Sequence, residues 1–175
     1  MKLWVFAALL FQALVAQAGE RKADERAGDE RAGDERAATV TRVSDGDTVW
    51  LRPDDGGKPF RLRLRGIDAP ERCQAWGTEA KLALAARVLE QRVRLTSRGN
   101  DDYRRVLGNI HLASGEDVSA WMVSQGHAWS YRYRRSPGPY AHEERQARAL
   151  KRGLFANEKS AIEPALFRRL HGSCD

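Results

Sequence analysis

Apolar and polar residues alternate in short runs from Thr39 onward, and turn residues separate the runs. The first three runs cover residues 39–44, 48–53 and 58–66, with the sequences DGD and DDGG between them. A period of two is typical of a strand with one buried face, and Asp-Gly pairs between such runs indicate hairpins. We therefore predict a three-stranded meander.

The third run alternates most sharply and carries much opposed charge. Three apolar residues alternate with three arginines, in the order Phe60, Arg61, Leu62, Arg63, Leu64 and Arg65. This pattern predicts one apolar face and one cationic face. Asp68 follows in the sequence RGIDAPE and has the same parity as the apolar residues, so a bend or bulge near Gly66 must re-aim it away from the core.

A helical spacing replaces the alternation after this strand. Residues 78–91 place Ala80, Leu84 and Val88 at positions i, i+4 and i+8, which gives one apolar stripe. Thr78 precedes this stripe and is a residue type that caps helix N-termini. We therefore predict a helix that begins at Thr78.

Two more strands and two more helices are predicted in the rest of the chain. Alternation marks strands over residues 92–97 and 106–112, Asp117 is placed to cap a helix that Gly126 ends, and a third helix covers about 140–152. Three strands, a helix, two strands and then helices is the order of an OB fold. The fold class is thus α+β, mainly β, with a five-stranded OB-fold Greek-key barrel and about three helices.

Residues 1–18 have the pattern of a secretory signal peptide. Lys2 precedes an apolar run over residues 3–15, and AQA gives a cleavage pattern before Gly19. The run is shorter than the roughly 20 apolar residues that span a bilayer. We expect a secreted or periplasmic protein without a membrane segment after cleavage, and the alternative is an uncleaved N-terminal anchor.

Residues 19–37 are charged and repetitive, with the triplet DER recurring every five residues. Such a segment has almost nothing to bury, so it cannot offset the entropy of ordering and should be a disordered spacer. The predicted organisation is a signal peptide over residues 1–18, this spacer, and one domain over residues 38–175, which is long enough for its own core.

The predicted domain is basic. The whole chain has a net charge of +6; removing Lys2 and the spacer's five basic and seven acidic residues leaves +7 on residues 38–175. This balance favours a polyanionic partner such as nucleic acid. Many exported proteins are basic without binding nucleic acid, so charge alone identifies no activity.

Two cysteines, Cys73 and Cys174, stand about a hundred residues apart. In an exported protein a disulfide is the favoured interpretation, with two unpaired thiols as the alternative. The bond would tie the C-terminal tail to the loop after Glu71. A metal site with histidine ligands is not expected, because the four histidines are scattered along the chain.

Acidic residues stand at two of the predicted turns. Asp45 and Asp47 flank Gly46 in the first turn, and Asp68 and Glu71 follow the third strand. Each is an ordinary loop acid when considered singly. An OB barrel brings these two turns together, however, so Asp47, Asp68 and Glu71 can converge into an oxygen-only cluster that suits Ca²⁺ or Mg²⁺.

Arginines accompany these acids. Arg63 lies on the cationic strand face, and Arg105 begins the fifth strand. Phosphodiester hydrolysis requires such neighbours, because its transition state adds negative charge and arginine donates two parallel hydrogen bonds to phosphate oxygens. The alternative for Arg63 is a solvated strand face without a ligand.

The chain from about Val40 to Phe155 resembles the staphylococcal nuclease family, also called the micrococcal nuclease or thermonuclease family. The matching motifs, in order, are SDGDTVWL, RLRGIDAPE, WGTEA, DYRRVLG, SQGHA and ARALKRGLF. The resemblance implies an OB barrel and Ca²⁺-dependent cleavage of phosphodiester bonds in DNA and RNA.

The resemblance also implies a role for each matching residue. By position, Asp47 and Asp68 correspond to the side-chain ligands of Ca²⁺, and the backbone carbonyl of Ala69 to a third ligand. Glu71 corresponds to the general base for the attacking water. The two arginines named above, Arg63 and Arg105, correspond to the pair that holds the phosphate.

Three tyrosines complete the implied site. Tyr103 corresponds to a substrate-binding tyrosine, and Tyr131 and Tyr133 resemble tyrosines beside the nucleotide, for which packing inside the fold is the alternative. Two departures concern the groove: Arg104 replaces a common glycine, and the loop from Glu71 to Trp76 is shorter than in the founding member of the family.

We therefore expect an exported, monomeric, Ca²⁺-dependent endonuclease with little sequence specificity, acting on DNA and RNA. One rival is a catalytically inactive nucleic-acid-binding OB-fold module. A second rival is an exported structural or adhesive domain that binds anionic surface polymers.

Overall fold

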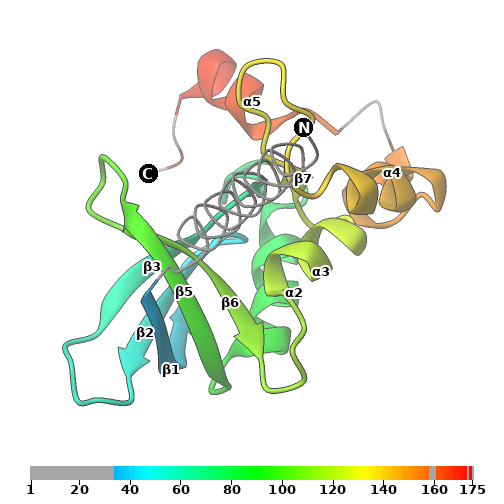
Figure 1. Cartoon of the computed structure of the whole chain (residues 1–175). Helices are drawn as coiled ribbons and strands as arrows, with labels where there is room; N and C mark the ends of the chain where they lie inside the picture. The colour runs from blue at the N-terminus through cyan, green and yellow to red at the C-terminus, as the bar shows by residue number, and fades with distance from the viewer. Residues whose placement is uncertain (1–33, 158–160, 173, 175) are drawn as a thin grey trace, which may run out of the picture. The chain divides into compact units, whose positions relative to one another are not determined.

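Five strands close into a barrel built from the alternating runs of the sequence (Figure 1). In the order in which they neighbour one another, the strands are β1 (Asp34–Val43), β2 (Thr48–Pro53), β3 (Phe60–Leu64), β6 (Val106–Leu112) and β5 (Arg92–Asn100). Neighbouring strands are antiparallel, except that β3 and β6 run parallel. The predicted five-stranded barrel is confirmed.

The structure, a computed structural model, describes residues 34–157, 161–172 and 174. The predicted signal peptide and the spacer up to residue 33 lie outside these residues. None of the helices in the described ranges is both long enough and apolar enough to cross a membrane.

Strand β1 begins five residues earlier than predicted, at Asp34 instead of Thr39, inside the charged segment expected to be a spacer. Residues 34–37 pair with residues 94–97 of β5. Further along, β1 also pairs with β2, and a register shift between Val40 and Arg42 bends it so that it can serve both neighbours. Backbone pairing thus orders a stretch whose polar composition alone predicted disorder.

The predicted apolar faces form the core. Leu62 and Leu64 on β3 are at most 1% exposed, and the helical stripe of Ala80, Leu84 and Val88 is fully buried. These three residues belong to α2 (Gly77–Val88), which packs against β1. The strand and helix patterns of the sequence therefore identified the core correctly.

The start of α2 differs from the prediction. Trp76, not Thr78, occupies the N-cap position, with a left-handed backbone (φ 72°) and no side-chain hydrogen bond to the helix. Thr78 lies inside the first turn. The hydrogen bond from the N–H of Gly77 to the carbonyl of Gln74 turns the chain into the helix early.

Three further helices are described. They are α3 (Val118–Ser124), α4 (Ala141–Ala149) and α5 (Pro164–His171), and a short 3₁₀ helix, η1 (Gly153–Asn157), follows α4. Asp117 caps α3 as predicted, because its side chain accepts hydrogen bonds from two backbone N–H groups of the first turn. Figure 1 shows α2, α3 and α4 beside the barrel. Helix α5 was not predicted from the sequence.

A second, small sheet joins the barrel to the helices. It pairs β4 (Ile67–Asp68) with β7 (Trp129–Ser130). The buried carboxylate of Glu144, on α4, accepts a hydrogen bond from the N–H of Ser130 and forms ion pairs with Arg132 and Arg148. These contacts of Glu144 fix β7, and β7 in turn pairs with β4, the strand that contains Asp68.

Candidate active site

A sharp bend at Gly66 separates β3 from β4. Gly66 has φ 75°, a conformation that favours glycine, and an added Cβ would approach Pro139 and Tyr140 to 2.5 and 2.8 Å. Its carbonyl accepts a hydrogen bond from the N–H of Tyr131. Because of the bend, Asp68 does not continue the core face of β3, and its Oδ1 lies 3.0 Å from Nη2 of Arg63.

Asp47 connects the first turn to the segment that follows β4. Its Oδ1 accepts a hydrogen bond from Thr48 and lies 2.5 Å from Nη1 of Arg63, while its Oδ2 accepts the N–H of Ala69. Asp47 and Asp68 are each only 5% exposed. The Arg63 guanidinium therefore pairs with two buried carboxylates that come from different turns.

Burial and neighbouring charge change the acid–base properties of this cluster. Burial raises the pKa of Asp68, against the opposing influence of Arg63. Burial and the charge of Asp47 raise the pKa of Asp45 to about 6. Burial on its own would lower the pKa of Arg63, but Asp47 and Asp68 outweigh it and raise that pKa, so Arg63 stays charged.

Glu71 stands in a tight loop between β4 and α2. Its N–H donates to Oε1 of Gln74, and its carbonyl accepts the N–H of Gln74. A Cβ added to Gly77 would lie 2.0 Å from the Glu71 carbonyl oxygen, so only glycine fits beneath the loop. The short loop noted in the sequence thus holds the backbone of Glu71 in one place.

The loop before β6 positions Arg105. Its backbone N–H donates to Oδ1 of Asp101, its Nε lies 2.7 Å from Oδ2 of Asp101, and its guanidinium lies over the Tyr103 ring at 5.2 Å. Burial works to raise the pKa of Asp101, but hydrogen bonds from Arg105 prevail and lower it. Arg61 donates a hydrogen bond to the carbonyl of Tyr103, which gives Arg61 a structural function. Arg104, which replaces the glycine expected from the resemblance, has φ 57°, in the left-handed region that favours glycine.

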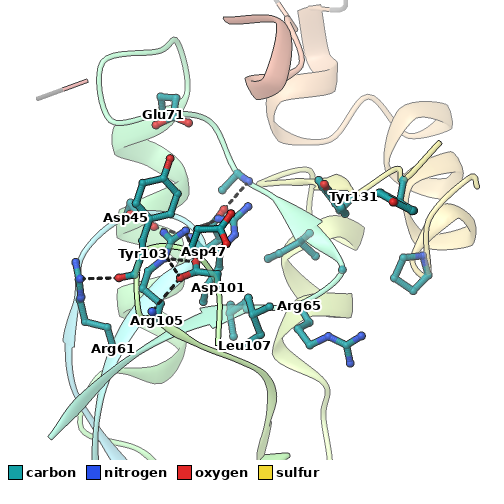
Figure 2. A pocket seen from close by; sticks show the side chains of 18 of the residues that line it. Asp45, Asp47, Arg61, Arg65, Glu71, Asp101, Tyr103, Arg105, Leu107 and Tyr131 are labelled. Carbon is teal, nitrogen blue, oxygen red and sulfur yellow. Dashed lines mark hydrogen bonds and ion pairs between the residues drawn. The ribbon is translucent and has the colours of Figure 1, made fainter. Parts of the chain in front are cut away.

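A cleft of about 820 Å³ brings these groups together. Its lining includes Asp47, Arg63, Glu71, Arg105 and the three tyrosines named from the sequence. Figure 2 shows Glu71 on a loop above the group formed by Asp47, Tyr103 and Arg105, with Tyr131 on the far side. The structure therefore gathers the candidate catalytic and substrate-binding residues around one space.

The three tyrosines do not pack inside the fold. Tyr103, Tyr131 and Tyr133 are 73%, 45% and 62% exposed, and all three line the cleft. The packing alternative therefore does not hold, and their rings are accessible to a ligand in the cleft.

The metal ligands expected from the sequence are arranged around arginines. Within the ranges that the structure describes, no three His, Cys, Asp or Glu side chains form a cluster that could hold a metal ion. Arg63 instead connects Asp47 with Asp68, and Ala69 donates its N–H to Oδ2 of Asp47. The buried carboxylates of Asp47 and Asp68, which contact the same guanidinium, are nevertheless hard oxygen donors of the kind that Ca²⁺ or Mg²⁺ prefers.

Sequence reasoning missed Arg168, on α5. Its Nη1 lies 2.6 Å from Oε1 of Glu71, and its Nη2 lies 3.2 Å from Oδ2 of Asp68. Burial alone would lower the pKa of Arg168, but its hydrogen bonds to these two acids raise it, so the group stays charged. The available signal was the cysteine pair, because Cys73 and Cys174 form the predicted disulfide and bring the tail to the Glu71 loop.

Known proteins resemble this chain over most of the domain. Residues 61–157, more than half of the chain, match the family described as Staphylococcal nuclease homologue. A micrococcal nuclease of Shigella flexneri is 35% identical over 140 aligned residues, which cover 74% of this chain and 79% of that protein. An uncharacterized endonuclease of Haemophilus influenzae is 36% identical over 130 residues, covering 74% and 71%. Protein ParB of Escherichia coli is 39% identical over 140 residues, covering 74% and 77%.

The family match covers only part of the candidate site. Arg63, Asp68, Glu71 and Arg105 lie inside residues 61–157, together with the three tyrosines. Arg168 lies beyond this range, on the C-terminal helix.

Proposed function

The chain belongs to the staphylococcal nuclease family, and from that premise we propose that it is an endonuclease that hydrolyses phosphodiester bonds of DNA and RNA with little sequence specificity. The observation that carries this proposal is the single cleft lined by Arg63, Arg105, Asp47 and Glu71. Opposed charges at this density are what hydrolysis of an anionic ester requires, because cations must neutralise the phosphate while a base activates water.

Arg63 and Arg105 bind the phosphate in this proposal. Each is held in place by carboxylates, since Arg63 pairs with Asp47 and Asp68 and Arg105 pairs with Asp101. A donor that is fixed before the substrate arrives needs no reorganisation during the reaction and can contribute about 3 to 4 kcal/mol to transition-state stabilisation. The planar guanidinium also matches the geometry of phosphate oxygens.

Asp47 and Asp68, with the carbonyl of Ala69, would hold a Ca²⁺ ion. A bound divalent cation stabilises negative charge on the phosphoryl oxygens. Glu71 is the general base that takes a proton from the attacking water, a contribution of typically about 10²- to 10⁴-fold in rate. Its side chain is 24% exposed, which leaves it accessible to that water from the cleft.

The exposed tyrosines provide a surface for bases. Stacking of a base on an aromatic ring tolerates any sequence, which supports broad specificity and a preference for single-stranded or breathing substrate. Tyr103, Tyr131 and Tyr133 line the same cleft as the arginines. Bases and phosphate would thus be held side by side.

Export and a monomeric state belong to the same proposal. The signal-peptide pattern of residues 1–18 supports export. The disulfide between Cys73 and Cys174 supports it independently, because such bonds persist mainly in oxidising compartments.

Digestion of DNA and RNA by the mature protein tests the activity and its metal requirement. We expect cleavage of both substrates with Ca²⁺ and loss of cleavage with EDTA, and parallel reactions with Mg²⁺ compare the two ions. Cleavage that continues unchanged in EDTA would contradict the metal requirement. Tight binding of nucleic acid without any cleavage would instead support the inactive OB-fold module.

Glu71→Gln tests the general base. The amide keeps the size of the side chain but cannot accept the proton of water at neutral pH, so the chemical step should slow by at least about 10²-fold while substrate affinity changes little. Single-turnover cleavage and filter binding measure the two quantities. Glu79→Gln, which changes an exposed glutamate in the first turn of α2, is the matched control and should behave as the wild type.

A further inference from the structure

The C-terminal segment, defined as residues 161–172 with Cys174, is fastened to the Glu71 loop. The disulfide joins Cys174 to Cys73, two residues after Glu71. Hydrogen bonds run from Arg72 to the carbonyl of Cys174 and from the side chain of Gln74 to the carbonyl of Ile162. The loop that carries the candidate base and the C-terminal segment therefore form one connected unit.

Arg168 extends from this segment to two carboxylates of the site. Its Nη1 lies 2.6 Å from Glu71 and 3.4 Å from Oδ1 of Asp68, and its Nη2 lies 3.2 Å from Oδ2 of Asp68. One guanidinium thus neutralises both the acid proposed to bind the metal and the acid proposed to activate water. Arg168 also lines the cleft, so it faces the space that substrate would enter.

We propose that Arg168 is an affinity-determining residue that competes with the divalent cation for Asp68 and Glu71, and that the Cys73–Cys174 disulfide holds it in position to do so. The inference rests on the proposed metal-dependent function. A divalent cation bound to Asp68 and Glu71 would need carboxylate oxygens that Arg168 contacts, and the repulsion between the two cations at that short range is screened little at the buried Asp68. The position of Arg168 therefore opposes binding of a cation.

The disulfide makes Arg168 a stronger competitor of the cation because it holds the C-terminal segment close to the two acids. A side chain on a tethered segment acts at a high effective concentration, and this concentration falls when the tether is cut. Apart from Pro164, the side chains of α5 are exposed or half-buried, so the helix has little apolar packing of its own to hold it against the site. Reduction of Cys73–Cys174 should therefore release Arg168 from the acids and raise the affinity for the cation.

Calcium binding provides a readout that does not depend on catalysis. Isothermal titration of Ca²⁺ into the oxidised, EDTA-treated mature protein should show about 10-fold tighter binding for Arg168→Gln than for the wild type, within the range by which groups contacting metal ligands change affinity. Arg169→Gln removes the same charge from an exposed position of the same helix and should change the dissociation constant less than about twofold. Equal or weaker binding by Arg168→Gln would overturn the proposal.

Reduction tests the part played by the disulfide. Treatment with a phosphine reductant should tighten Ca²⁺ binding to the wild type but leave Arg168→Gln unchanged, because that variant has no competitor left to release. The Cys73→Ser/Cys174→Ser double variant, checked for a native circular dichroism spectrum, should match the reduced wild type. An equal effect of reduction on the wild type and Arg168→Gln would overturn the tethering argument.

One further variant separates this inference from the proposed function. Asp47→Asn removes a proposed metal ligand that Arg168 does not contact, and it should abolish Ca²⁺ binding. Binding that is lost in Asp47→Asn but unaffected by Arg168→Gln would overturn only the competition. Absence of Ca²⁺ binding in the wild type and in Arg168→Gln, together with no EDTA-sensitive cleavage, would overturn the proposed metal site as well.

Discussion

Arg63 combines a structural and a functional role in one side chain. It pairs with two aspartates that are 5% exposed each, and it also lines the cleft proposed to bind phosphate. A buried carboxylate is costly when its partner is removed, whereas a paired one is tolerated. The residue that binds substrate in our proposal therefore also offsets the cost of burying Asp47 and Asp68.

Arg63→Ala should lower the free energy of unfolding by about 3 kcal/mol at neutral pH, because it leaves two buried carboxylates without their shared cation. Arg63→Lys should lose less stability, since the ammonium keeps the charge, yet it should lose cleavage activity because it cannot donate in a planar, bidentate arrangement. Urea denaturation and a DNA cleavage assay measure the two effects. Arg52→Ala, at an exposed position on β2, is the control, and equal stability of Arg52→Ala and Arg63→Ala would contradict the argument.

Site residues that lie close together in the sequence could be predicted from it, whereas the site residue from the distant C-terminal segment could not. Arg63 and Asp68 stand five positions apart, and the parity of the strand with the glycine between them was enough to require the bend that the structure contains. Arg168 meets Asp68 across a hundred residues of chain. No local period encodes that contact, because it depends on how the C-terminal segment is placed against a loop about a hundred residues earlier in the chain.

At the scale of elements, the connection between β4 and α2 controls the position of Glu71. The loop is closed by backbone hydrogen bonds and by the absence of a side chain at Gly77, whose added Cβ would lie 2.0 Å from the Glu71 carbonyl oxygen. Trp76 accommodates this closure with a left-handed backbone in place of a conventional cap. The helix start is thus determined by the loop and not by the intrinsic capping preference of Thr78.

Gly77→Ala should lower the free energy of unfolding by about 1 to 3 kcal/mol, because backbone must move to admit the methyl group. It should also reduce cleavage by displacing Glu71, while Thr78→Ala should change stability by less than about 0.5 kcal/mol because Thr78 makes no capping hydrogen bond. Denaturant titration of both variants, with cleavage rates for Gly77→Ala, checks the pair. A larger loss for Thr78→Ala than for Gly77→Ala would restore the sequence-based prediction of the cap.

Long elements with a clear period were predictable from the sequence, and short or polar ones were not. The alternation in β3 and the stripe on α2 identified buried residues correctly. The pair β4 and β7 consists of two residues each, too few for any period to show, and α5 leaves most of its residues exposed. These elements depend on contacts between residues far apart in the sequence. Glu144 holds β7 through a hydrogen bond, and the disulfide fastens the C-terminal segment that contains α5.

At the scale of the whole molecule, one covalent bond connects the end of the chain to the active-site loop. Cys73 and Cys174 are separated by 101 positions, so the bond closes a loop that includes α2, two barrel strands and the later helices. In the chain-entropy model a loop of this length stabilises the folded state by roughly 4 to 5 kcal/mol, by restricting the unfolded chain. The folded state also changes on reduction, however, since α5 has little packing of its own.

Reduction should therefore cost less stability than the loop length alone predicts. Reduction increases the conformational entropy of the unfolded chain, but release of α5 also increases the entropy of the reduced native protein. The two gains partly cancel, so the free energy of unfolding should fall by about 2 to 3 kcal/mol. Guanidinium denaturation of oxidised protein and of the Cys73→Ser/Cys174→Ser variant measures this loss. Hydrogen exchange of the same pair should show lost protection in α5 and in the Glu71 loop, with the barrel strands still protected. A loss of the full 4 to 5 kcal/mol with α5 still protected would mean that the helix stays docked without its tether.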